Sequence, residues 1–341
     1  MVVMQPMMML IFSLSAVAIV WFGAQLIDAG NLEVGNMIAF MQYAMQVIMS
    51  FLMLSFIFIM VPRASVSVGR IAEVLDTDPA IKDPIRPKKY SAATKGIVEF
   101  RDVTFCYPGA DTPVLQNITF EALAGEITAF VGSTGSGKST LINLIPRFYD
   151  VNKGNVLIDG LDVREVSQKD LCNKIGYVPQ RGVLFSGSLK SNVKYGAPKA
   201  TDVELKQAIK TAQATDFVME LEHKYDTNIA QGGSNVSGGQ KQRLSIARAI
   251  IKKPEIYIFD DSFSALDFRT DAALRAALAK ETKKVTVLIV AQRVSTILTA
   301  DKIVVLDEGK IVGIGTHAEL MKTSPVYKEI VLSQLSEKEL A

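Results

Sequence analysis

Basic residues are missing from the start of this sequence. The chain has 341 residues with 37 Lys and Arg against 35 Asp and Glu, but residues 1–62 contain no Lys or Arg, and their only acids are Asp28 and Glu33. Cysteine is also scarce, since Cys106 and Cys172 stand alone, which excludes a disulfide scaffold and fits a reducing compartment. A net charge of +2 is too near neutral to predict nucleic acid as the main partner.

Two long runs without charge occupy this N-terminal part. Met7–Ile27 and Met37–Val61 each have enough residues to cross a hydrocarbon core about 30 Å thick as a helix. Buried helices of a soluble protein are the alternative, but these rarely exceed about 20 residues without a charge. No basic region precedes the first run, and it continues past Ala16–Ala18, so we predict two membrane spans rather than a cleaved signal peptide.

The charges around the two runs predict their orientation. The connection Asp28–Asn36 carries only acids, whereas Arg63, Arg70 and further basic residues follow the second run. The positive-inside rule therefore places the connection outside and the long C-terminal part in the cytoplasm of a multi-pass protein of the cell membrane.

Methionines recur every four residues along the second run. Flexible thioethers at this spacing suit a promiscuous surface for lipophilic ligands, and ordinary packing against lipid or another helix is the more common use of such a stripe. The stripe consists of Met37, Met41, Met45, Met49 and Met53.

Residues 76–95 have the composition of a linker. Asp78-Pro79, Asp83-Pro84 and Arg86-Pro87 interrupt any helix there, and charges are dense. We therefore predict a partial transmembrane domain over 1–75, a linker over 76–95 and a soluble domain over 96–341.

Strand-like and helix-like segments alternate in the soluble part, which predicts an α/β domain with a largely parallel sheet. The predicted strands are Val98–Phe105, Ile118–Glu121, Ile127–Val131, Lys174–Val178, Glu255–Phe259, Thr286–Val290 and Ile303–Leu306. The predicted helices are Leu141–Ile145, Leu205–Ala214, Gln240–Lys252 and Thr270–Ala279.

A glycine-rich loop follows the predicted strand Ile127–Val131. Its sequence, Gly132-Ser133-Thr134-Gly135-Ser136-Gly137-Lys138-Ser139, fits the pattern G-x-x-x-x-G-K-[ST] between a strand and a helix. Backbone N–H groups and the helix N-terminus would hold phosphates, Lys138 would add a positive charge, and Ser139 would place its hydroxyl on Mg²⁺.

Two further segments complete this pattern. Asp260 ends the apolar strand before it and can reach Mg²⁺ beside the loop. Ser237-Gly238-Gly239-Gln240 opens a helical stretch, where small residues form either an anion cradle or a simple helix cap.

Together these segments resemble the nucleotide-binding domain of ATP-binding cassette (ABC) transporters. Gly132–Thr140 matches the family's Walker A loop, Ile256–Asp261 its Walker B strand, and Val236–Arg243 its signature. The resemblance implies an ABC-type P-loop NTPase fold with a helical subdomain, and the two spans resemble the last two helices of an exporter half. It also implies ATP and Mg²⁺ as ligands.

The resemblance assigns further roles. Tyr107 corresponds to the aromatic residue that stacks on adenine, and Gln180 to the glutamine that contacts Mg²⁺ and senses the membrane domain. Ser264–Asp267 is similar to the D-loop. Ser237–Gln240 would complete an ATP site on a second domain.

The sequence departs from the family pattern at two catalytic positions. Asp261 stands where a Glu usually orients the attacking water, and it is one methylene shorter. Gln292 stands where a switch His usually precedes Arg-x-Ser-Thr, and Gln cannot carry a proton. Gln231 also replaces a Glu that often lies shortly before the signature.

The resemblance and its departures imply a subunit of an exporter for lipophilic substrates in the lipid bilayer. Its own site would hydrolyse ATP weakly, and a second half with the intact Glu and His would form a heterodimer with it. A non-hydrolytic ATP-binding regulatory module, an inactive truncated product and a soluble ATPase acting on nucleic acid remain alternatives. Because an exporter half normally has six spans, we also expect four helices to be missing upstream of Met1.

Overall fold

A computed structural model describes residues 4–91, 95–293 and 297–334 of the chain. The chain forms two compact units, Met1–Ala80 and Ile81–Ala341. Each unit is described by itself below.

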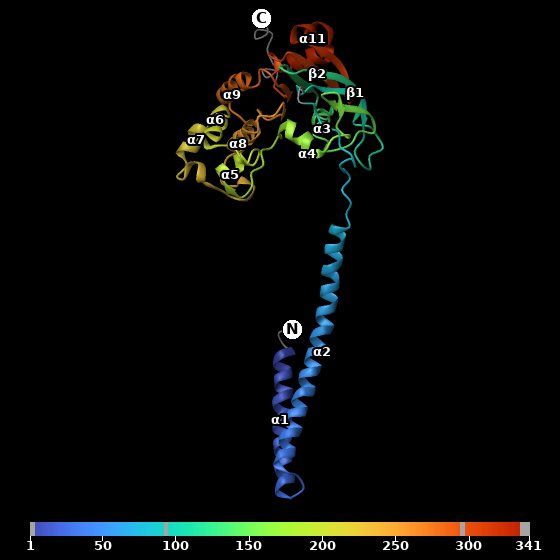
Figure 1. Cartoon of the computed structure of the whole chain (residues 1–341), viewed down its shortest axis with the longest axis vertical. Coiled ribbons are helices and arrows are strands. Elements are labelled where there is room, and N and C mark those ends of the chain that lie inside the picture. The colour runs from blue at the N-terminus through green and yellow to red at the C-terminus, as the bar shows by residue number, and fades with distance from the viewer. Residues whose placement is uncertain (1–3, 92–94, 294–296, 335–341) are drawn as a thin grey trace. The chain divides into compact units, whose positions relative to one another are not determined.

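The first unit is a pair of helices that lie side by side, α1 (Met4–Asp28) and α2 (Val34–Leu75) (Figure 1). Both are long and apolar enough to cross a membrane, and almost none of either span is buried within the structure. The two predicted apolar helices are therefore confirmed. The second helix is longer than the predicted span Met37–Val61, because it continues past Pro62 for several turns into a polar segment.

Helices α1 and α2 approach each other closely at Gly23. A Cβ atom there would lie 2.6 Å from the sulfur of Met37, so the absence of a side chain permits the contact. The methionine stripe does not stay on this face, because a step of four residues overshoots a full helical turn by about 40°. Met45 is 39% exposed, and Met49 and Met53 are more exposed still, at 62% and 71%.

The second unit is built on a six-stranded sheet in the order β12-β11-β3-β10-β9-β6. All neighbours pair in parallel except β11 and β12, so the predicted largely parallel sheet is confirmed. The strands are β3 (Ile127–Gly132), β6 (Ile175–Val178), β9 (Ile256–Asp260), β10 (Thr286–Val290), β11 (Lys302–Asp307) and β12 (Lys310–Gly315).

A second sheet, in the order β2-β1-β4-β5, is antiparallel, and the alternation of strands and helices in the sequence does not distinguish it from the parallel sheet. Its strands are β1 (Val98–Phe105), β2 (Leu115–Ala122), β4 (Lys153–Ile158) and β5 (Leu161–Asp162). The sequence did not reveal β4, because its first half is exposed and contains a glycine, so only Val156–Ile158 has the apolar character of a strand. A two-stranded pair joins β7 (Gly187–Ser188) to β8 (Asn228–Ile229).

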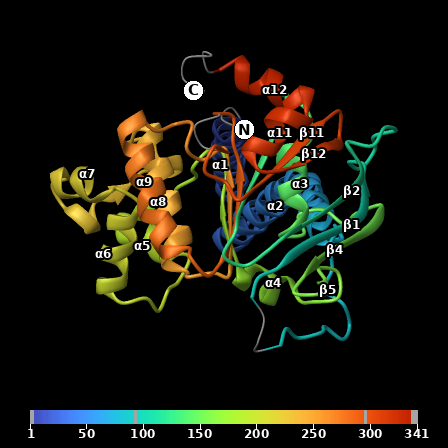
Figure 2. The same ribbon diagram turned by 90° about the horizontal axis from the view of Figure 1, so that it is seen from above.

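Helix α3 (Lys138–Leu144) lies in a core shared by both sheets. Leu141 and Ile142 pack in one buried cluster with Phe100 of the antiparallel sheet and Ile258 of the parallel sheet. Figure 2 shows the helices α5 to α9 grouped beside the sheets as a helical subdomain. The other helices given by the described residues are α4 (Gln168–Lys174), α5 (Leu189–Lys194), α6 (Asp202–Thr211), α7 (Thr215–Glu220), α8 (Gly238–Ile251), α9 (Phe268–Glu281), α11 (His317–Thr323) and α12 (Pro325–Leu332). Short 3₁₀ turns cover Lys224–Asp226 and Gln231–Gly233.

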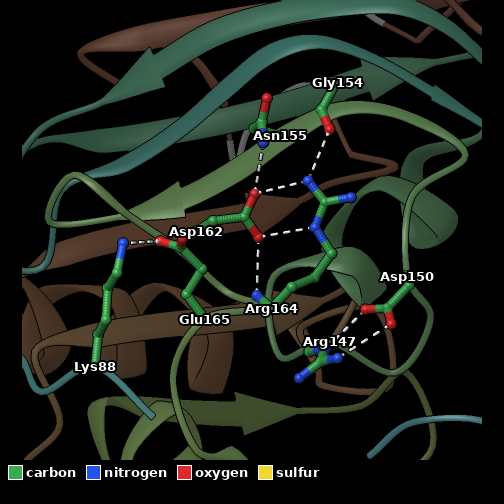
Figure 3. A network of polar contacts seen from close by, with 8 residues as sticks. All are labelled: Lys88, Arg147, Asp150, Gly154, Asn155, Asp162, Arg164 and Glu165. Carbon is green, nitrogen blue, oxygen red and sulfur yellow. Dashed lines mark hydrogen bonds and ion pairs between the residues drawn. The ribbon is translucent and has the colours of Figure 1, made fainter. Parts of the chain in front are cut away.

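A polar network fixes the turn after β5 and the chain that crosses it (Figure 3). The Arg164 guanidinium donates to both carboxylate oxygens of Asp162, and Asn155 donates to one of them at 2.7 Å. Burial alone would raise the pKa of Asp162, but these hydrogen bonds hold it below its ordinary value. Beside this turn, Lys88 bonds to Glu165 at 2.8 Å and forms a strand-like bridge to Val166.

The second half of the predicted linker is therefore attached to the soluble unit. The backbone N–H of Gln168 donates to Asp83 at 2.8 Å, and the Tyr90 ring lies 4.6 Å from the Lys174 ammonium. Lys174 is itself nearly buried between Asp159, at 3.0 Å, and Glu255. Asp159 also accepts the backbone N–H groups of residues 95–97.

We expect Lys174→Met to destabilise the protein by about 3–5 kcal/mol, because it leaves the buried Asp159 carboxylate without its cation. Chemical denaturation of the detergent-solubilised chain, followed by the fluorescence of the soluble unit, measures the effect. Lys253→Met is the matched control, because it breaks an exposed ion pair with Glu204 and should hardly change the midpoint. Equal effects of the two substitutions would contradict the importance of the buried cluster.

Candidate nucleotide-binding site

The glycine-rich loop joins β3 to α3 at the carboxyl edge of the parallel sheet. Gly132 has a φ of +155°, and a Cβ there would lie 2.1 Å from the Leu306 carbonyl oxygen. Gly137 has a φ of +97°, and its Cβ would lie 2.7 Å from the Leu115 side chain. No side chain fits at either position without displacing a neighbour, so the pattern of glycines follows from the close packing of the loop.

Lys138 reaches back over this loop. Its ammonium donates to the carbonyl oxygens of Gly132 at 2.9 Å and Ser133 at 2.7 Å. Burial lowers its pKa, and the nearby carboxylates of Asp261 and Asp260 oppose that shift. The cation is therefore positioned at the centre of the loop, where a phosphate would lie.

Ser139 and Asp260 form a pair of oxygen groups beside the loop. The Ser139 hydroxyl donates to an Asp260 carboxylate oxygen at 3.0 Å. Asp260 is only 6% exposed, and its pKa is raised by burial and by the neighbouring Asp261, while the Ser139 hydrogen bond opposes the rise. Hydroxyl and carboxylate oxygens are suitable ligands for Mg²⁺.

Asp261 follows in a constrained backbone conformation. Its φ is +45°, in the left-handed region, and its N–H donates to the Val290 carbonyl oxygen at 3.0 Å. Its carboxylate accepts a hydrogen bond of 3.3 Å from the side-chain amide of Gln180, which lies just beyond β6. The structure thus brings together the predicted Asp261 and Gln180.

Gln242, which the sequence places in the predicted signature without a role of its own, connects the Gln180 segment to α8. Its side chain accepts the N–H of Gly182 at 2.8 Å and donates to the Pro179 carbonyl oxygen at 3.0 Å. Gln242 is 1% exposed although polar. The signal for this contact in the sequence is a polar residue on the face of a predicted helix that should be buried.

Gln292 lies just beyond β10 and lines the same cavity as the loop. The next residue, Arg293, donates to the carbonyl oxygen of Ser264 at 3.0 Å and, more weakly, to that of Leu266 at 3.5 Å. This ties the predicted switch segment to the predicted D-loop. The rest of the switch motif, residues 294–296, lies outside the described residues.

The cavity has a volume of about 530 Å³. Most of the residues predicted for the ATP site line this cavity. Ser136 does not, because it is buried within the loop. The predicted residues in its wall are Gly132, Ser133, Thr134, Gly135, Gly137, Lys138, Ser139, Thr140, Gln180, Asp260, Asp261 and Gln292. Ile297 and three residues near the C-terminus, Ile330, Ser333 and Gln334, were not predicted.

Tyr107 is not among the described residues that line this cavity. Its hydroxyl lies 2.9 Å from that of Thr140, which does line it. Its ring packs edge-on against Phe105 and Tyr149, with centroids 5.0 and 5.1 Å away. The aromatic residue therefore lies beside the cavity and is engaged by its own neighbours.

The predicted signature lies apart from this cavity. Ser237 caps α8, because its hydroxyl accepts the N–H of Gln240 and the Gln240 side chain accepts the N–H of Ser237 in return. Ser237 and Gly238 are exposed, and none of Ser237–Gln240 is among the described residues of the cavity wall. The exposed Ser237 and Gly238 therefore face outward from the domain that carries the loop.

Comparison with known proteins agrees with this geometry. A family model described as ABC transporter matches residues 115–264. An uncharacterized ABC transporter ATP-binding protein of Mycobacterium tuberculosis is 48% identical over 97% of this chain and 57% of its own length. Residues 115–264 belong to the ABC transporter family.

Exporters are among the similar proteins. A candidate multidrug export ATP-binding/permease protein of Staphylococcus aureus is 40% identical over 92% of the chain and 54% of its own length. A solved bacterial Atm1-family ABC exporter with ATP bound has a TM-score of 0.80 and 33% identity, over 97% of this chain and 58% of that one. The chain therefore spans little more than half the length of these ABC relatives.

We expect Asp260→Asn to stabilise the nucleotide-free ABC domain near neutral pH. The folded state raises the pKa of Asp260, so folding becomes less favourable as the pH rises from the ordinary Asp pKa through the raised one, and the neutral amide avoids this loss. The unfolding midpoints of the variant and the unaltered chain should converge at acid pH, where Asp260 is protonated in both states. A constant difference across that pH range would contradict the assignment.

Proposed function

We propose that this chain binds ATP with Mg²⁺ and serves as the ATP-binding subunit of an ABC exporter. The loop supplies a close-fitting glycine cradle with Lys138 at its centre, which suits the phosphates of a nucleotide. Ser139 and Asp260 would hold Mg²⁺ next to it. Mg²⁺ bound there would neutralise part of the negative charge on the phosphates.

The residues of this cavity support the proposal that this chain's own site hydrolyses ATP only weakly. Asp261 would have to position the attacking water, but its carboxylate is one methylene shorter than that of Glu and is engaged by Gln180. A displacement of about 1 Å can reduce a rate about 10²-fold. Gln292 would hydrogen-bond a phosphate oxygen without being able to carry a proton.

The outward-facing signature supports the proposal that this chain acts together with a partner. Ser237 and Gly238 are exposed, away from the described wall of the cavity that holds the phosphate loop, so they could complete the ATP site of a second domain. This separation of the exposed signature from the cavity of the phosphate loop is the observation that carries the proposal. We propose a heterodimer with a second exporter half that has the intact Glu and His.

Efflux of lipophilic compounds is the proposed activity of the assembly in the lipid bilayer. The two helices of the first unit are apolar and almost unburied, as spans that pack against lipid or further helices would be. The exposed Met49 and Met53 provide a flexible apolar surface. The multidrug export named for the Staphylococcus aureus relative agrees with this class of substrate.

The first test compares ATP binding and turnover of the unaltered chain with the double variant Asp261→Glu and Gln292→His. We expect similar nucleotide binding and turnover on the order of 10²-fold faster in the variant, because it restores both catalytic positions. Lys138→Ala is the control that should lose binding in both backgrounds. Equally fast turnover by the unaltered chain would contradict a weak site.

A non-hydrolytic regulatory module is the second candidate, and the same Asp261 and Gln292 favour it. The two candidates differ when the chain is combined with a second exporter half. Stimulated turnover that is lost on Ser237→Arg in this chain supports the heterodimer, because the large side chain blocks the signature. Tight ATP binding without turnover in any pairing supports the regulatory module.

A further inference from the structure

The C-terminal end of the described chain forms part of the cavity wall. Ile330, Ser333 and Gln334 line the cavity together with the phosphate loop and Gln292. The side-chain amide of Gln334 donates to the backbone carbonyl oxygen of Gln292 at 2.7 Å. This contact joins the end of the domain to the residue that occupies the switch position.

Gln334 is held by a well-packed helix. Tyr327 and Val331 of α12 are fully buried in the core that includes β3 and β11. The Tyr327 hydroxyl lies 2.8 Å from the His317 ring nitrogen of α11. Just past the helix end, the Gln334 N–H donates to the Val331 carbonyl oxygen at 3.1 Å. The amide of Gln334 therefore extends from a backbone that is fixed on the sheet.

The main chain around Gln292 is anchored on both sides. Before it, the Ala291 N–H donates to the Phe130 carbonyl oxygen of β3 at 3.3 Å. After it, Arg293 donates to Ser264. Gln292 itself lies between these anchors, and the hydrogen bond from Gln334 fixes its peptide group directly.

We infer that Gln334 is a positioning residue that holds the Gln292 peptide so that the side chain at 292 faces the phosphate end of the cavity. The direction of a side chain follows the orientation of its own peptide, so a fixed carbonyl limits where residue 292 can reach. The role assigned to residue 292 rests on the proposed function. The hydrogen bond and its effect on the main chain do not.

The test uses the full chain and three single substitutions. Gln334→Met keeps the length and loses the donor, whereas Gln334→Lys keeps a donor on a flexible stem. Lys328→Met is the control, since Lys328 is exposed on α12, the helix that precedes Gln334, and is not among the described residues of the cavity wall. Amide hydrogen exchange is followed in peptides that contain Ala291–Arg293, with and without MgATP.

We expect exchange in these peptides to rise about threefold to tenfold in Gln334→Met, which is the factor that one net hydrogen bond contributes. Gln334→Lys and Lys328→Met should exchange like the unaltered chain. Unchanged exchange in Gln334→Met would overturn the inference, whatever the chain's rate of ATP turnover.

A second measurement separates positioning from general stability. In the background Asp261→Glu with Gln292→His, Gln334→Met should lower kcat about threefold to tenfold and leave the KM for ATP unchanged. In the background Asp261→Glu with Gln292→Ala, Gln334→Met should have no effect on kcat, because no side chain remains at position 292 to be directed. An equal loss in both backgrounds would overturn the positioning role. Failure of the proposed function would show itself differently, as fast turnover by the unaltered chain.

Discussion

Parallel strand pairing is the constraint on which the rest of the site depends. Strands β3, β10 and β9 run in the same direction with Val290 opposite both Phe130 and Asp260, so their carboxyl ends meet at one edge. The residues that follow these strands are the phosphate loop, the switch segment and Asp261. The phosphate loop lies more than 120 positions before Asp261 and the switch segment in the sequence, and only the common direction of the strands brings all three into one cavity. Antiparallel pairing of β9 would move Asp260 to the opposite edge of the sheet.

Much of this edge could be predicted from the sequence. Buried parallel strands consist of short apolar runs, so β3, β9 and β10 were recognisable, and the loop and Asp260 follow them directly. The antiparallel sheet was less accessible, because half of β4 is exposed. Gln334 could not be predicted, since its contact with Gln292 depends on how α12 packs on the sheet, and no local pattern records a contact between residues 42 positions apart. The surroundings of Tyr107 depend in the same way on Tyr149 from another segment.

The charges at the cavity would suit the proposed ligand, which brings both phosphate and metal. Lys138 is half-buried and uses the carbonyl oxygens of its own loop as acceptors, while burial lowers its pKa. Asp260 is buried beside Asp261 with one hydroxyl as a donor, and its pKa is raised. A phosphate would favour the charged form of Lys138, and a divalent cation would favour the carboxylate of Asp260. Burial thus disfavours the charged form of each group, and bound nucleotide and metal would offset that cost in free energy.

The identity of residue 261 sets two effects against each other. Its φ of +45° lies in the left-handed region, which Asp adopts more readily than Glu does. The difference in backbone strain between the two is a fraction of the 1–2 kcal/mol that this region costs an ordinary residue. A 10²-fold loss of rate from the shorter side chain corresponds to about 2.7 kcal/mol in the transition state, at 1.36 kcal/mol for each factor of ten. The conformational gain is thus smaller than a catalytic loss of this size, so backbone strain alone does not account for Asp at this position. The shorter Asp261 carboxylate, engaged by Gln180, agrees instead with the proposed division of labour, in which this site would mainly hold its nucleotide while ATP is hydrolysed at the second site of the heterodimer.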